Sequence, residues 1–160
     1  MHELQVPDIG LLENWLKQAG HDSWMCDRCD GLHVSTLQSQ ESVLDSRLFL
    51  EPYGILFTTE IDLKASSILQ VNADMARLNM SLPTLKLFLE VMDNGGAMLV
   101  ASHVLLTSKG INYSQFCDYI AMALEAKNWL LNECLQQRYL FAGEEDSTAP
   151  PHPENKPSLH

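Results

Sequence analysis

Basic residues are scarce in this sequence. Its 160 residues include ten lysines and arginines against 21 aspartates and glutamates, which gives a formal net charge of −11. The basic residues stand one at a time along the chain, so no stripe of positive charge can neutralise a phosphate backbone, and we expect no direct nucleic-acid binding. A strong negative charge keeps a protein soluble and steers it toward basic partners. We therefore expect the chain to bind a protein partner, which the sequence does not identify.

Long apolar stretches are also lacking. No run of about 18 apolar residues occurs, and the N-terminus has neither a basic start nor an apolar segment. The sequence therefore predicts no membrane span, no signal peptide and a cytoplasmic location. In that reducing compartment the four cysteines are not expected to form structural disulfides. Cys117 and Cys134 fall inside the last predicted helix, where we expect them to pack as small apolar side chains.

Signature motifs of enzymes and of nucleotide-binding proteins are missing. The sequence contains no G-x-x-x-x-G-K-[ST], no G-x-G-x-x-G, no nucleophile elbow and no H-E-x-x-H, and Gly95 and Gly96 belong to a predicted hairpin turn. His103 lies within an apolar strand, where we expect a hydrogen-bonded structural histidine. No acid and base pair can be identified, so we expect neither enzymatic activity nor a cofactor.

Hydrophobic periodicity divides the chain into helices and strands. Apolar residues repeat about every 3.6 positions in three segments, alternate in two hairpins, and form one further pair of short extended runs around a cysteine-containing loop. The predicted order is α-β-β-β-β-α-β-β-α, an α+β domain in which helices flank an antiparallel sheet. We place this single domain at residues 1–142 and expect the acidic, proline-rich residues 143–160 to be a disordered tail.

Capping and turn residues predict several boundaries of these elements. Asp8 can cap the first helix, and Asn112 with Gln115 three positions later resembles a capping box at the start of the last one. Asn94-Gly95 is a strong hairpin signal between the last two strands.

The first long hairpin has a predicted inner and outer face. Leu44, Leu48 and Leu50 share one side of its first strand, and we expect that side to face the core. Asp45 and Arg47 alternate with them, so we expect these two charged side chains to be solvated.

The stretch MCDRCDGLH contains a C-x-x-C pair followed by a histidine. Cys26, Cys29 and His33 could supply three ligands to a metal ion such as zinc, but no second C-x-x-C completes a four-ligand site. The fourth ligand would have to be His21, Cys117 or Cys134. Strand alternation directs His33 to the solvent face, so we interpret the stretch first as a hairpin turn and second as a metal site.

A redox role for the same stretch is a further alternative. A thioredoxin-type dithiol places its first cysteine at a helix N-terminus, where the dipole lowers the pKa of the thiol. Here a turn and a strand follow Cys26, and we expect Asp27 and Asp30 to raise the pKa of a thiolate. Catalytic redox chemistry is therefore not favoured, whereas a reversible disulfide between Cys26 and Cys29 stays open.

Apolar residues of the last predicted helix form a band that is wider than the stripe one packing contact would cover. Part of this band could contact a second copy of the chain and form a homodimer, and large side chains dominate such contacts. We select Trp129, Leu130 and Tyr139 as anchors of this interface. In the alternative, all three residues complete the core of a single chain.

A family resemblance is carried by four stretches: VPDIGLLENWLKQAG, CDRCDGLHV, DSRLFLEPYGILFTTEIDLKASSILQVNADMARLNMSLPTLKLFLEVMD and GINYSQFCDYI. Across about residues 5–140 the chain resembles the YbjN family of enterobacterial regulators. The resemblance implies a fold like that of type III secretion chaperones. It also implies a regulator that lowers exopolysaccharide production, motility and virulence functions without a recognised DNA-binding domain. It carries over no catalytic or ligand residue.

We therefore expect a non-enzymatic regulator that acts through protein contacts and represses exopolysaccharide production, virulence and motility. One alternative is a protein like a type III secretion chaperone that binds an extended effector segment along its sheet. Another is a metal or thiol sensor that uses the loop at residues 26–33.

Overall fold

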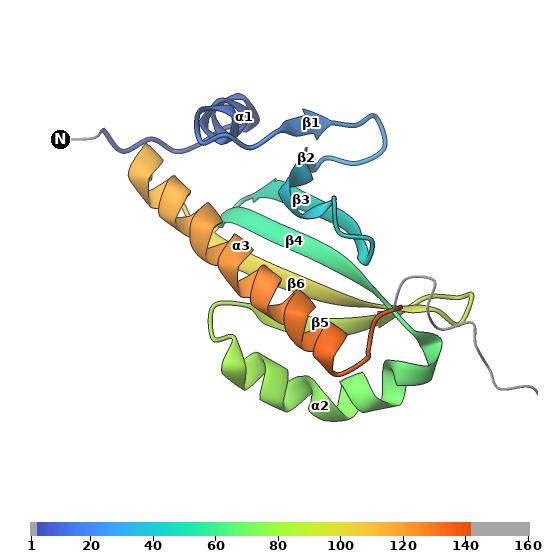
Figure 1. Ribbon diagram of the computed structural model, residues 1–160. Helices are drawn as coiled ribbons and strands as arrows, with labels where there is room; N and C mark the ends of the chain where they lie inside the picture. Colours follow the sequence, from blue (N-terminus) through green and yellow to red (C-terminus); the bar gives the residue numbers. More distant parts are fainter. Residues whose placement is uncertain (1–2, 142–160) are drawn as a thin grey trace, which may run out of the picture.

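The computed structural model describes residues 3–141, where a six-stranded sheet packs against three helices (Figure 1). In chain order the elements are α1 (Ile9–Gln18), β1 (Ser23–Met25), β2 (Leu32–Val34), β3 (Val43–Glu51), β4 (Gly54–Leu63), α2 (Ile68–Ser81), β5 (Lys86–Val91), β6 (Ala97–Leu106) and α3 (Tyr113–Gln136). The predicted tail at residues 143–160 lies outside the described residues. Between residues 3 and 141, no helix combines the length and the apolarity that crossing a membrane requires.

The strands lie in the order β1-β2-β3-β4-β6-β5, and every neighbouring pair is antiparallel. The chain forms β1 to β4 in sequence, leaves the sheet for α2, and returns as the β5–β6 hairpin. In this hairpin β6 pairs with β4, which leaves β5 at the edge of the sheet. The predicted α+β class and the predicted order of elements are confirmed.

The helices pack against one face of the sheet. Figure 1 shows α3 running across the sheet, with α1 near its start and α2 near its end. Trp15 of α1 packs on Phe116 of α3 with ring centroids 5.4 Å apart, and Arg77 of α2 forms an ion pair with Glu133 of α3. Apolar side chains from the helices and from this face of the sheet form one buried core. Among residues 3–141, no helix covers the other face.

Local hydrogen bonds set the ends of the helices as predicted. The Asp8 carboxylate accepts a hydrogen bond from the backbone N–H of Leu11 at 2.8 Å. Asn112 and Gln115 form a reciprocal capping box in which both bonds are 2.9 Å long. These bonds satisfy N–H groups that have no partner inside the helix. The predicted turn between β5 and β6 is also present, and Gly95 adopts a φ of 82° there.

The predicted face of β3 was wrong at the start of the strand. A β-bulge between Val43 and Asp45 shifts the pairing with β4. An extra residue at a bulge turns the residues beyond it to the opposite face, so Val43 is buried and Leu44 is 48% exposed. Leu48 is buried as predicted, whereas Leu50 near the other end of the strand is exposed.

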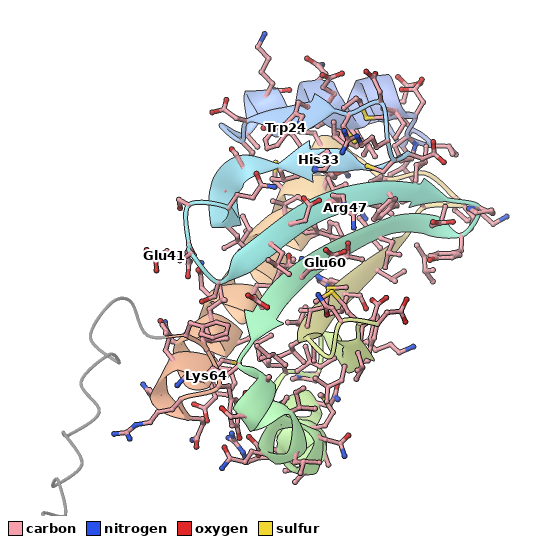
Figure 2. The ribbon with its side chains drawn as sticks, turned by 90° about the vertical axis from the view of Figure 1, so that its right-hand side faces the viewer. Trp24, His33, Glu41, Arg47, Glu60 and Lys64 are labelled. Carbon is pink, nitrogen blue, oxygen red and sulfur yellow. The ribbon has the colours of Figure 1, made fainter. Side chains whose placement is uncertain are left out.

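One register row crosses the face of the sheet that the helices leave uncovered. Strand pairing connects one residue from each strand, in the order Trp24, His33, Arg47, Thr58, Ser102 and Lys86. Directly paired residues of antiparallel strands project to the same side. We call the surface that this row crosses the open face, and Figure 2 shows several of its side chains on neighbouring strands.

Candidate functional site

A loop at residues 26–31 connects β1 to β2 near one edge of the sheet. The antiparallel pairing of these two strands closes the loop and brings Cys26 Sγ to 3.2 Å from Cys29 Sγ. Gly31 lets the loop pack closely on β3, because a Cβ atom at this position would lie 2.8 Å from the ring of Phe49. The predicted hairpin is therefore present, and both cysteines lie on its loop.

His33 of β2 points toward the two thiols. Its Nε2 lies 3.2 Å from Cys26 Sγ and 3.4 Å from Cys29 Sγ, so the three residues singled out in the sequence come together. His33 projects from the uncovered side of the sheet, as strand alternation predicted. The expectation that it is therefore solvent-exposed and turned away from the cysteines was wrong, since the residue is only 9% exposed. The ring of Trp24 covers it in a stacked arrangement, with centroids 5.3 Å apart and planes 9° apart (Figure 2).

Asp45 of β3 contacts the second nitrogen of the His33 ring. Its Oδ1 lies 2.9 Å from His33 Nδ1, and the same oxygen accepts hydrogen bonds from Gln38 Nε2 at 3.0 Å and from the backbone N–H of Ser46 at 2.8 Å. Because a carboxylate only accepts, Nδ1 of the neutral ring carries the proton and Nε2 turns its lone pair toward the thiols. Metal-ligating histidines have this arrangement, with a carboxylate on the second nitrogen.

Ion pairs extend from Asp45 across the open face. Arg47 of β3 forms an ion pair with Glu60 of β4, and its Nε lies 3.4 Å from Asp45 Oδ2. The Arg47 guanidinium also lies 5.2 Å from the centroid of the Phe49 ring. Asp45 and Arg47 are therefore half-buried and paired, and the prediction that they are solvated was wrong. The contacts His33–Asp45–Arg47–Glu60 connect β2, β3 and β4, and Figure 2 shows His33, Arg47 and Glu60 on these neighbouring strands.

The pKa of the Cys26 thiol is lowered from its ordinary value. The largest cause is a hydrogen bond from Cys29 to the Cys26 sulfur, and the next is a hydrogen bond from the backbone at Arg28. Asp27 acts in the predicted direction and raises the pKa, but its effect is smaller. The predicted direction of the Asp27 effect is therefore correct, but the pKa is lowered overall because close hydrogen bonds outweigh this charge.

The residues considered as a fourth metal ligand do not join the cluster. Within residues 3–141, the group of potential ligands comprises Cys26, Cys29 and His33. His21 Nδ1 instead lies 2.8 Å from Thr36 Oγ1. Burial in the core raises the pKa of the Cys134 thiol to about 12, and Cys117 belongs to α3. The site therefore offers two thiols and one imidazole.

Comparison with known proteins places this chain in a family. A family model described as "Putative bacterial sensory transduction regulator", YbjN, matches residues 8–136. The chain belongs to the YbjN family. YbjN of Escherichia coli K12 is 28% identical over 146 residues, which cover 91% of this chain and 92% of that protein, and YbjN of Shigella flexneri has the same identity and coverage. The family prediction is confirmed.

A solved YbjN structure supports the same assignment. The crystal structure of YbjN from E. coli, "a putative transcription regulator", matches this structure with a TM-score of 0.82 at 29% sequence identity. The match covers 87% of this chain and 99% of that chain. The six-stranded sheet and its helices are therefore a YbjN fold.

The three residues predicted as interface anchors lie in different environments in this YbjN-family protein. Leu130 and Tyr139 are 0% and 5% exposed within the single chain, and Tyr139 donates a hydrogen bond to Asp74 Oδ2 at 2.9 Å. Their assignment to an interface is corrected, since their side chains are buried in the core. Trp129 is 42% exposed. It lines a groove of about 290 Å³ together with Leu82, Met122 and neighbouring residues.

His103 of β6 is a packing residue rather than a hydrogen-bonded one. Its ring lies against Tyr119 of α3 with centroids 4.7 Å apart, and its buried Nδ1 has no hydrogen-bond partner among residues 3–141. Burial lowers the pKa of His103, and the nearby Lys127 lowers it further. The expected structural role therefore rests on ring packing.

Proposed function

We propose that this protein is a non-enzymatic cytoplasmic regulator that acts through protein contacts on the open face. The observation that supports this proposal is a broad sheet surface that no helix in residues 3–141 covers and that keeps apolar side chains in solvent. Trp24, Phe88, Val104 and Leu106 are all exposed there, and strand pairing puts them on the same side of the sheet. Uncovered apolar surface of this kind is typical of interaction sites.

The charges of the open face favour a basic partner. Register rows place Asp45, Glu60, Asp62 and Glu90 on this side. Of the two basic residues in the register row, Arg47 is already paired with two of these carboxylates, and Lys86 is exposed at the β5 edge. Together with the net charge of −11, this surface would attract a positively charged protein segment and repel a like-charged one. The partner would therefore be a basic segment that lies across the face.

The edge of the sheet is less suited to a partner than its face. Asn79 of α2 accepts a hydrogen bond from the backbone N–H of Leu87 at 2.9 Å and donates one to the carbonyl of the same residue at 3.2 Å. These bonds occupy the outward-facing backbone groups of Leu87, near the start of β5, which an added strand would need there. A chaperone-like mode in which an effector pairs with this part of β5 is therefore disfavoured.

The physiological effect that we propose is repression of exopolysaccharide production, motility and virulence functions. The family described as a sensory transduction regulator supports a regulatory role, and the choice of these processes rests on the resemblance of the sequence to the enterobacterial regulator AmyR. A strain that lacks the gene should overproduce exopolysaccharide, and the wild-type gene should restore repression.

Variants of the open face test this function. Phe88→Asp combined with Val104→Asp changes two exposed side chains of the open face, and Leu69→Asp is the matched control because Leu69 is exposed on α2. We expect the double variant to fold, as checked by circular dichroism, but to leave exopolysaccharide high, while the control restores repression. Full repression by the double variant, or failure of the control, would contradict the assignment to this face.

A further inference from the structure

The thiols of Cys26 and Cys29 and the imidazole of His33 face one another closely enough to share one ion. The three sides of the triangle that Cys26 Sγ, Cys29 Sγ and His33 Nε2 form are 3.2, 3.4 and 3.2 Å long. Zinc binds sulfur at about 2.3 Å and nitrogen at about 2.0 Å in a tetrahedron, which sets the ligand atoms roughly 3.5–3.8 Å apart. An outward movement of a few tenths of an ångström would therefore admit the ion.

We propose that Cys26, Cys29 and His33 bind one Zn²⁺ ion through the two sulfurs and Nε2, with a fourth position left for water or another external ligand. This site goes beyond the protein contacts proposed above and does not depend on them. Two thiolates and an imidazole suit a borderline-soft cation such as Zn²⁺, whereas Mg²⁺ and Ca²⁺ prefer oxygen ligands. On binding, the protons of both thiols are released to solvent.

The surroundings of His33 support a built site rather than a chance meeting of side chains. Asp45 Oδ1 receives the Nδ1 proton, and Asp45 itself is held by Gln38 and by the backbone of Ser46. The stacked ring of Trp24 fixes the plane of the imidazole. A carboxylate on the second nitrogen orients a metal-ligating histidine and increases its basicity. Nε2 is therefore aimed at the thiols before any ion arrives.

The number of ligands indicates the kind of site. No fourth cysteine, histidine or carboxylate of residues 3–141 joins the cluster. Structural zinc sites have four protein ligands, whereas sites with three keep one position for an exchangeable ligand. The ion would therefore be accessible to external ligands and would also connect the loop at residues 26–31 to β2.

A disulfide between the two cysteines is the competing state of the same residues. The structure gives both as free thiols, and β2 rather than a helix follows the loop, so the pair lacks the helix dipole that activates redox dithiols. Oxidation would remove two of the three ligands. Zinc binding should therefore be complete in reduced protein and lost after oxidation.

The test is metal titration of the reduced, full-length protein. Co²⁺ serves as a spectroscopic substitute for Zn²⁺, since coordination by thiolates produces a sulfur-to-cobalt charge-transfer band. We expect the band to saturate at one Co²⁺ per chain, to be abolished by one equivalent of Zn²⁺, and to persist in excess Mg²⁺. Native mass spectrometry should detect one Zn²⁺ per chain.

Four variants connect the band to the proposed atoms. Cys26→Ser and His33→Gln should abolish it, whereas Cys117→Ser, the matched control outside the cluster, should leave it unchanged. Asp45→Asn keeps every ligand and should weaken Zn²⁺ affinity about 10–100-fold, the usual effect of losing such a carboxylate. It also keeps the proposal testable if a ligand variant fails to fold. The absence of a thiolate band in the reduced wild type, or equal Zn²⁺ affinity of wild type and Cys26→Ser, would overturn the site.

Discussion

Lys127 provides the sharpest test of the core, because a lysine side chain is fully buried between α3 and the sheet. It is 0% exposed. Its Nζ donates a hydrogen bond to the backbone carbonyl of Phe57 at 3.3 Å and lies 3.3 Å from the centroid of the Phe57 ring. Burial lowers the pKa of the Lys127 ammonium well below its ordinary value. We predict that Lys127→Met, which keeps the length of the side chain and removes its polar end, stabilises the protein.

The expected gain follows from the contacts of Nζ. A buried polar group without adequate partners costs about 1–3 kcal/mol, and the hydrogen bond to Phe57 offsets about 1 kcal/mol of this. Methionine removes both effects, so Lys127→Met should raise the free energy of unfolding by up to about 2 kcal/mol at a pH where the lysine is neutral in both states.

Below pH 10.5 the gain should increase. Because the pKa of Lys127 is lowered in the folded state, the unfolded chain binds one proton more than the folded chain in the range between the two pKa values. The stability of the wild type is then lost as the pH falls toward the folded-state pKa, by up to about 1.4 kcal/mol per pH unit for one proton. Lys127→Met lacks this dependence.

Urea unfolding of both proteins at several pH values between 7 and 9.5 measures the difference. Lys109→Met is the control, since Lys109 is exposed, and its effect should stay within about 0.5 kcal/mol at every pH. If Lys127→Met is less stable than the wild type, or if the difference between them does not change with pH, then Lys127 is not a neutral buried amine and the reasoning fails.

Three further predictions concern the cap, the loop and the last helix. Asn112→Ala loses the bond to the backbone N–H of Gln115 and should lower the free energy of unfolding by about 1 kcal/mol; urea unfolding without a measurable change would contradict the cap. Gly31→Ala should lower it by about 1–3 kcal/mol, because the new Cβ meets the Phe49 ring at 2.8 Å, and an unchanged melting temperature would refute this. Leu130→Ala should cost about 2–5 kcal/mol as a core truncation. Trp129→Ala should lower the free energy of unfolding by less than Leu130→Ala does. If Trp129 anchors a homodimer, this variant should instead lower the molecular mass measured by light scattering. A larger loss of stability from Trp129→Ala than from Leu130→Ala would show that Trp129 is the core residue.

Several features of this protein were readable from single stretches of sequence. The side chains of Asp8 and Asn112 bind backbone groups three residues away, so no distant contact is needed to recognise them. Asn94-Gly95 defines its hairpin turn for the same reason. Even the burial of Lys127 has a local signal, because it lies three or four positions from the buried residues Ala123, Leu124, Leu130 and Leu131 on α3.

The candidate site could be predicted only in part. The spacing of Cys26, Cys29 and His33 identified the candidate ligands, and alternation predicted the side of the sheet on which His33 lies. The burial of its ring against the thiols was not predicted, because strand alternation does not indicate which face a hairpin loop will cover. The role of Asp45 was missed, because the sequence suggested only that it is solvated. Its contact with His33, which pairs directly with the neighbouring Arg47, depends on the register of β2 against β3, which no local pattern expresses.

The sequence by itself therefore determined the kinds and the order of the elements, their caps and turns, and the presence of two cysteines and a histidine on one hairpin, because each depends on residues a few positions apart. Only the tertiary structure decided that β6 inserts between β4 and β5, that Leu130 and Tyr139 are core, and that Asp45 meets His33. These contacts join segments distant in the chain. Their partners are selected by packing of the whole sheet against its helices, which is a property of the assembled fold.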